Sequence, residues 1–262
     1  MTSRGLGFLP DDPRLVELEL YTRPAEALVG GDAGVSETFP LAWSNLAHVK
    51  QLPDQGLTQS CVGQAAATAL ETLSHLHGRP IARPSALAIY TYARLIARPH
   101  QPLVDVGCSP SAALQGMRDR GLVAESRWSL QEHDVDEAMP VDVDQHALDA
   151  LLGEHHRAAP GRGIAERLRL AIHQGHVPIY AQDVDQSFMS YDGSAVFRDL
   201  SSGIRGRHMQ AIVGYGPDWF LVAGSWGRDW GRDGFALVAD EFMESGACDS
   251  FIFLTLAPKQ VT

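Results

Sequence analysis

Apolar residues recur at helical spacing soon after residue 60. The repeat runs Val62, Ala65, Ala66, Ala69, Leu70, Leu73, Leu76. Gly78 follows this run, and glycine commonly ends a helix. The pattern predicts a helix that starts near Cys61, and similar spacing predicts three more helices over 85–97, 111–121 and 164–175.

The pattern changes after residue 176, where short apolar runs alternate with Gly, Asp or Pro turns. These runs cover 176–184, 209–216, 219–226, 234–240 and 250–256. Their length and β-branched or aromatic content predict strands. Helices followed by strands indicate an α+β protein that has a helical lobe and a lobe built from a sheet or barrel.

The ends of these patterned regions predict the domain organisation. Residues 1–40 are rich in Pro, Gly and acidic residues, and they read as an N-terminal extension with at most one short strand or turn. Residues 41–262 then form the main domain, with a helical lobe over about 41–145 and a β-rich lobe over about 146–262. The acidic stretch 131–145 reads as a solvated connector between the lobes.

The net charge and the length of the apolar runs argue against several classes of binding partner and against a membrane span. The 262-residue chain has a net charge of −11 and no cluster of Lys and Arg, which argues against binding to nucleic acid or an anionic membrane. No apolar run reaches the length of a signal peptide or a membrane span. We therefore expect a cytoplasmic protein, with export by a signal-less route left open. The sequence does not determine the oligomeric state.

Cysteine and histidine usage argues against a disulfide framework and a metal site. The three cysteines are Cys61, Cys108 and Cys248. An odd, sparse set fits a reducing compartment. The histidine pairs 155–156 and 173/176 lack an accompanying ligand cluster, so solvated or half-buried histidines are the simpler interpretation. We expect no metal and no cofactor.

Cys61 and His208 are candidates for nucleophilic catalysis. Cys61 falls at the predicted start of a helix, where unpaired N–H groups stabilise a thiolate, so we expect a lowered pKa. A thiolate nucleophile needs an acid–base partner, and His208 at the start of a predicted strand is a candidate. Taken alone, each residue fits a structural role better than a catalytic one.

Three separated blocks of sequence resemble the papain-like cysteine peptidases, particularly their bacterial branch without disulfides. The blocks are "DQGLTQSCVGQAAATALE", then "PSALAIYTYAR" with "DVGCSPSAALQGMRDRGLVAESRW", and finally "HMQAIVGYG" with "WFLVAGSWGRDWGRDGFALV". The resemblance covers roughly residues 38–256. His208 follows Cys61 by 147 residues, which agrees with the spacing of this family.

The resemblance implies a two-lobe fold with a peptide cleft and assigns roles to individual residues. Cys61 matches the nucleophile and His208 its acid–base partner. Gln55 matches the glutamine whose amide joins the Cys61 N–H in an oxyanion hole, which stabilises the tetrahedral intermediate. A turn residue is the alternative interpretation of Gln55.

The same resemblance identifies substrate-binding positions. Gly107 and Cys108 match a short loop whose backbone pairs with an extended substrate. Trp226 matches the tryptophan that covers the catalytic histidine, and a plain core residue is the alternative.

The chain also departs from the family pattern. Val62 follows the nucleophile in place of an aromatic residue, and Thr58 and Asp105 stand where other members carry disulfide cysteines. Gly224 stands where the family has the asparagine that orients the histidine, so we expect weakened activity and a gain in kcat on Gly224→Asn if the backbone accepts a Cβ. Residues 1–36 are a candidate short pro-segment.

These features favour a cysteine-type peptidase, with a peptide or protein as substrate. The reaction would pass through a thioester on Cys61, with His208 as general acid and base. Two alternatives stay open at this point. One is a catalytically degenerate peptide-binding module, and the other is an acyltransferase on the same scaffold.

Overall fold

The computed structural model describes residues 4–13, 22–24, 39–130, 135–144, 147–148 and 152–257. In this part of the chain the helices are η2 (Leu46–His48), α2 (Cys61–Leu76), α3 (Ala86–Ala97), α4 (Pro110–Arg120), α5 (Val141–Asp144), α6 (Ile164–His173), α7 (Gln186–Met189) and α8 (Asp240–Met243). The strands are β1 (Thr22–Pro24), β2 (Trp43–Ser44), β3 (Leu122–Val123), β4 (Ala147–Leu148), β5 (Leu152–Ala158), β6 (Pro178–Val184), β7 (Gly206–Tyr215), β8 (Trp219–Ala223), β9 (Phe235–Ala239) and β10 (Cys248–Leu256).

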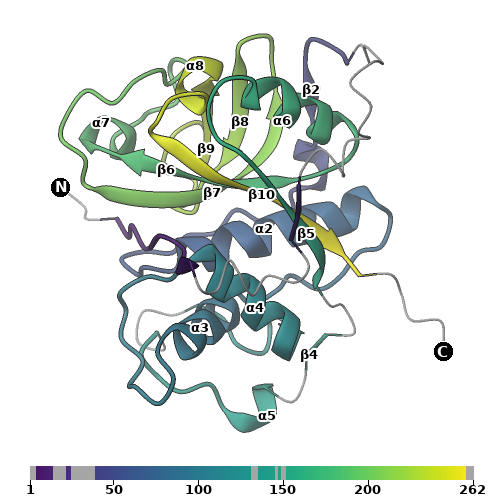
Figure 1. The fold of residues 1–262 in the computed structure, drawn as a ribbon, viewed down its shortest axis with the longest axis vertical. Coiled ribbons are helices and arrows are strands. Elements are labelled where there is room, and N and C mark those ends of the chain that lie inside the picture. Colours follow the sequence, from purple (N-terminus) through teal and green to yellow (C-terminus); the bar gives the residue numbers. More distant parts are fainter. Residues whose placement is uncertain are drawn as a thin grey trace.

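The main sheet and the helices α3 and α4 form two layers, as expected for a two-lobe α+β fold, and α6, α7 and α8 pack against the sheet. One sheet has the strand order β1-β5-β10-β6-β7-β8-β9, with β2 paired to β7. Figure 1 shows this sheet above α3 and α4, with α2 between the two layers. Helix α2 packs against both β7 and α3, so its two sides face different lobes. The residue at the start of α2 is therefore placed where the lobes meet.

The four predicted helices and five predicted strands all form, with small shifts at their ends. Helix α2 is buried over 14 of its 16 residues, which its small alanine side chains allow. Ser85 caps α3 by accepting a hydrogen bond from the Ala88 N–H, and Gly121 ends α4 with φ of 79°.

The N-terminal extension contributes to the sheet. β1 pairs in parallel with β5, so residues 22–24 belong to the β-rich layer. Strand β2, within the range expected for the helical lobe, pairs with β7. The structure does not describe residues 1–3, 14–21 and 25–38 of the extension, or 131–134 and 145 of the acidic stretch.

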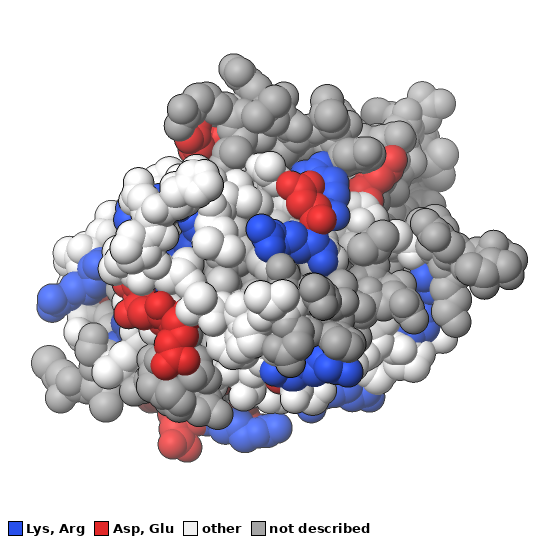
Figure 2. Space-filling view, turned by 90° about the horizontal axis from the view of Figure 1, so that it is seen from below, with Lys and Arg blue, Asp and Glu red and all other residues white. Residues whose placement is uncertain are grey.

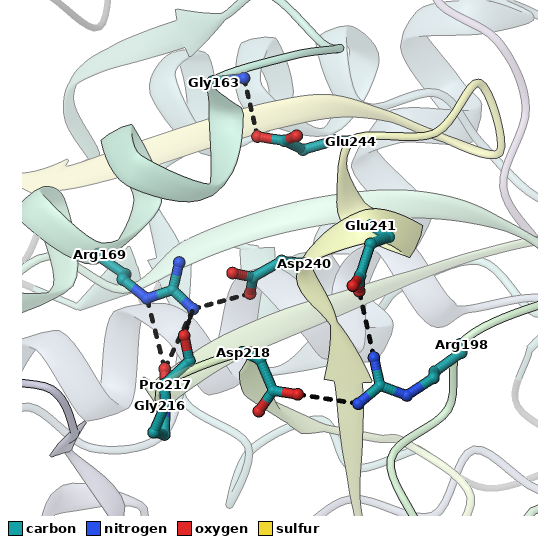
Figure 3. A network of polar contacts seen from close by, with 9 residues as sticks. All are labelled: Gly163, Arg169, Arg198, Gly216, Pro217, Asp218, Asp240, Glu241 and Glu244. Carbon is teal, nitrogen blue, oxygen red and sulfur yellow. Dashed lines mark hydrogen bonds and ion pairs between the residues drawn. The ribbon is translucent and has the colours of Figure 1, made fainter.

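A polar network links α6, α8 and the turn between β7 and β8. Arg169 on α6 donates hydrogen bonds to Gly216 O at 3.0 Å and to Asp240 Oδ1 at 2.7 Å (Figure 3). Glu244 accepts one from the Gly163 N–H, and Arg198 pairs with Asp218 and Glu241. These contacts connect α6, α8 and the β7–β8 turn.

On the face seen in Figure 2, the acidic and basic residues that the structure describes are interspersed. Within the described residues, no helix combines the length and hydropathy needed to cross a bilayer.

Candidate active site

Cys61 is the first residue of α2 and is completely buried. Backbone N–H groups of Met209, Gly7, Val62 and Cys61 itself approach its sulfur and favour the thiolate. Burial has the larger effect and raises the pKa of the thiol to about 12. The expected lowering of the Cys61 pKa is therefore wrong for this arrangement. The loss of hydration destabilises the thiolate more than the backbone N–H groups at the helix start stabilise it.

His208 is the third residue of β7 and is also completely buried. The Trp226 ring stacks on its imidazole, with 4.3 Å between centroids and 22° between planes. Burial, together with the nearby positive charge of Arg4, lowers the pKa of His208 to about 3. The imidazole and the Cys61 thiol are thus both neutral at pH 7.

Gln55 lies in the loop before α2 and is 1% exposed. Its Nε2 donates to Thr58 O at 2.7 Å and to Gly5 O at 3.3 Å. Its Oε1 accepts a hydrogen bond of 2.6 Å from Ser225 Oγ, which lies 3.4 Å from His208 Nε2. Gln55 and His208 therefore meet through Ser225, and the Gln55 amide already holds a peptide carbonyl.

That carbonyl belongs to the chain's own N-terminal segment, residues 4–9. Figure 1 shows this purple segment running between the sheet and the helical layer. Arg4 donates to Trp226 O at 2.9 Å, and Trp226 Nε1 donates to Gly5 O at 3.3 Å. The Leu6 N–H donates to Gln59 Oε1 at 3.0 Å. The segment covers both Cys61 and His208, which explains why neither side chain reaches water.

Gly107 and Cys108 flank the other end of the segment. The Cys108 N–H donates to Gly7 O at 2.9 Å, and the Leu9 N–H donates to Cys108 O at 3.0 Å, as in a parallel strand pair. Gly107 has φ of 87°, and a Cβ there would lie 2.2 Å from Gly7 O. This loop therefore lies against an extended backbone, and glycine permits the close approach.

Two glycines let the segment approach the loop that precedes α2. A Cβ on Gly5 would lie 1.8 Å from Thr58 O, and one on Gly7 would lie 1.6 Å from Gln59 O. Real Cβ atoms do not come so close to backbone oxygens. The alternation of Gly5, Leu6 and Gly7 is the sequence signal for this contact.

Phe8 is the buried anchor of the segment, at 5% exposure. The Arg207 guanidinium lies 4.5 Å from its ring centroid, within the range of a cation–π contact. Asp183 and Asp249 hold this guanidinium at 3.0 and 2.7 Å. The Arg207 charge is thus already paired beside the candidate histidine.

Asp105 joins the two loops that surround the site. Its carboxylate accepts hydrogen bonds from the Gln59 N–H at 2.9 Å and from Tyr90 Oη at 2.8 Å. Tyr90 Oη in turn accepts one from the Gly107 N–H at 2.8 Å. All three cysteines are free. Hydrogen bonds to Asp105 therefore connect these loops. The resemblance implies that other family members carry disulfide cysteines at the positions of Thr58 and Asp105.

Gly224 has no room for a side chain. Its φ lies outside the left-handed range, so backbone strain is not the obstacle. A Cβ would instead lie 2.5 Å from the ring of Trp230, which is 1% exposed and donates from Nε1 to Phe188 O. The expected benefit of asparagine at this position therefore conflicts with the packing. The polar atom observed beside His208 Nε2 belongs to Ser225, a residue that the sequence motifs did not single out.

The histidine pairs are structural in part. His155 and His156 on β5 are buried, not solvated or half-buried, whereas His173 and His176 are partly buried. Among the described residues, no group of three or more His, Cys, Asp or Glu side chains is placed to hold a metal ion.

Comparison with known proteins agrees with this geometry. The model of the papain family cysteine protease matches residues 40–252. Among curated relatives, the probable cysteine protease RDL3 of Arabidopsis thaliana is 23% identical over 219 residues, which cover 77% of this chain and 53% of that protein. A cathepsin L-like protein of Caenorhabditis elegans is 25% identical over 75% of this chain and 58% of its own length. The chain thus spans about half the length of these relatives.

Solved structures show the same fold at low sequence identity. Xylellain, a cysteine protease from Xylella fastidiosa, superimposes with a TM-score of 0.76 at 20% identity, over 98% of both chains. The bromelain protease from Ananas comosus, solved with the E64 inhibitor, gives 0.68 at 18% identity, over 84% of this chain and 100% of its own. The family match extends over most of the chain and includes Cys61, His208 and the loops around them, so this chain belongs to the papain family of cysteine proteases.

Proposed function

We propose that the chain is a cysteine-type peptidase held in a latent form by residues 4–9. The observation that carries the proposal is the position of this segment. The Gly5 carbonyl accepts a hydrogen bond from Gln55 Nε2, and the Gly7 backbone N–H is among the groups that favour the Cys61 thiolate. An extended peptide backbone therefore already lies along the nucleophile and the candidate oxyanion donor.

In the proposed reaction, His208 removes the proton from the Cys61 thiol and the sulfur attacks the substrate's carbonyl carbon. The oxygen of the tetrahedral intermediate takes hydrogen bonds from Gln55 Nε2 and the Cys61 N–H. The C–N bond then breaks, and the leaving amine takes the proton from His208. Water, activated by the same imidazole, hydrolyses the thioester and restores the thiol.

Latency follows from the position of residues 4–9. The parallel pairing with Cys108 and the burial of Phe8 keep substrate away from the site. Burial also holds the Cys61 pKa near 12 and the His208 pKa near 3, which disfavours the thiolate–imidazolium pair that the chemistry needs. Opening of the segment would remove both obstacles.

Deletion of residues 1–10 tests the proposal. This truncation keeps Asp11, which binds the Ser111 N–H and Arg157, and it keeps β1 within the sheet. We expect the truncated protein to cleave a peptide library and to react at Cys61 with an electrophilic probe much faster than the full chain does. A truncated Cys61→Ala protein is the matched control.

The outcomes distinguish the alternatives. A truncated, folded protein that binds peptides without cleaving them or labelling Cys61 would be a degenerate binding module. Products that carry an added amine in place of water, identified by mass spectrometry, would make the protein an acyltransferase. Hydrolysis with equal rates before and after truncation would refute latency alone.

A further inference from the structure

Ser225 connects the two parts of the candidate catalytic machinery. It is the second residue after β8 and is 3% exposed. Its hydroxyl lies 2.6 Å from Gln55 Oε1 and 3.4 Å from His208 Nε2. A single hydroxyl therefore touches both the oxyanion donor and the acid–base residue.

The direction of these hydrogen bonds follows from counting protons. Gln55 Nε2 faces two carbonyl oxygens, those of Thr58 and Gly5, so the other end of the amide must be its oxygen. An oxygen only accepts, so Ser225 must donate its single proton to Gln55. Toward His208 the hydroxyl can then only accept, which requires a proton on His208 Nε2.

This chain of bonds selects one form of the neutral imidazole. With the proton on Nε2, the lone pair that acts as base is on Nδ1. Within the described part of the chain, His208 Nδ1 is buried and has no hydrogen-bond partner. That nitrogen is therefore the one that can act as the base in the proposed reaction.

We propose that Ser225 is the positioning residue that fixes the tautomer of His208 and the orientation of the Gln55 amide. Gly224 offers no side chain for this purpose, and Trp230 leaves no space for one. The inference rests on the proposed peptidase function for its catalytic meaning, whereas the tautomer itself is a property of the folded chain.

The first test measures that tautomer directly. In the full chain, ¹⁵N NMR of labelled histidine at pH 7 should show His208 protonated on Nε2, with its signals identified by their loss in His208→Ala. In Ser225→Ala the imidazole should lose this single form and populate both tautomers. A wild-type His208 protonated on Nδ1 would overturn the inference, whether or not the protein hydrolyses peptides.

The second test uses turnover in the protein lacking residues 1–10. Ser225→Ala should lower kcat roughly 10–100-fold with little change in KM, by analogy with metal-bound histidines that lose an orienting partner. Ser225→Thr keeps a hydroxyl and should restore most of the rate. Ser74→Ala is the matched control, because it removes a buried hydroxyl that bonds Glu71 O at the other end of α2.

The two tests separate failure of this inference from failure of the proposed function. If the truncated parent shows no hydrolysis, the peptidase proposal fails, and the NMR result still decides the role of Ser225. If the parent is active and Ser225→Ala retains both its kcat and the Nε2 tautomer, the role of Ser225 is refuted. If Ser225→Ala does not fold, the wild-type tautomer and the Ser225→Thr kinetics decide.

Discussion

Gly7→Ala should open the latent form in the full-length protein. The new Cβ would lie 1.6 Å from Gln59 O and 2.1 Å from its carbonyl carbon, so no side-chain rotation relieves the clash. The Gln59 backbone cannot retreat easily, because Asp105 binds its N–H at 2.9 Å. The closed arrangement is therefore penalised, whereas residue 7 is in water once the segment has left.

The size of the effect follows from typical costs of overpacking. Forcing extra carbon atoms into a packed site costs about 1–3 kcal/mol. Since about 1.4 kcal/mol corresponds to a tenfold change in an equilibrium, the open fraction should rise about 5–150-fold. The rate of Cys61 alkylation by iodoacetamide should rise by the same factor, measured by peptide mapping with buried Cys248 as internal reference.

Gly203→Ala is the matched control for this prediction. Gly203 has no heavy atom within 4 Å of an added Cβ, so the same substitution there should leave the labelling rate unchanged. If Gly7→Ala folds and labels Cys61 no faster than Gly203→Ala, residues 4–9 do not limit access to the thiol, and the account of latency fails.

Three further predictions concern pH and packing. His208 is buried and neutral when the segment is closed, and its pKa is then near 3, against 6.5 in water. The free-energy difference that favours the closed form is therefore largest above pH 6.5 and decreases as the pH falls toward 3. At pH 5 the free energy that favours the closed form should be smaller by about 2 kcal/mol, so the Cys108 amide should show about 30-fold less protection from hydrogen exchange than at pH 7. Equal protection at the two pH values would contradict this prediction. Gly224→Asn should lower the melting temperature without raising kcat, because its Cβ meets the Trp230 ring; a stable, faster variant would contradict the packing argument. Asp105→Ala should lower the free energy of unfolding, measured by urea titration, by about 2–4 kcal/mol, because it leaves the Gln59 N–H and the Tyr90 hydroxyl without their acceptor. A decrease of less than about 1 kcal/mol would mean that water replaces the carboxylate.

Local sequence determined the main elements and the placement of the candidate nucleophile. The apolar repeat after residue 60 predicts a buried helix, and Cys61 is the first residue of that helix. The later apolar runs became β6 to β10 for the same reason. Strand β5 was missed because its pattern is irregular, with adjacent His155 and His156, and because it is buried only once β1 and β10 pair with it.

The state of the site was decided by tertiary structure. A helix start favours a thiolate, and this local rule predicted a low pKa for Cys61. Residues 4–9, more than fifty positions earlier in the chain, remove water from the sulfur and reverse that prediction. Likewise, the missing asparagine at Gly224 is visible in the sequence, but the Trp230 ring behind it and the Ser225 hydroxyl beside His208 are not. Helix and strand formation depends on near neighbours, whereas proton affinity and access depend on which distant residues exclude water.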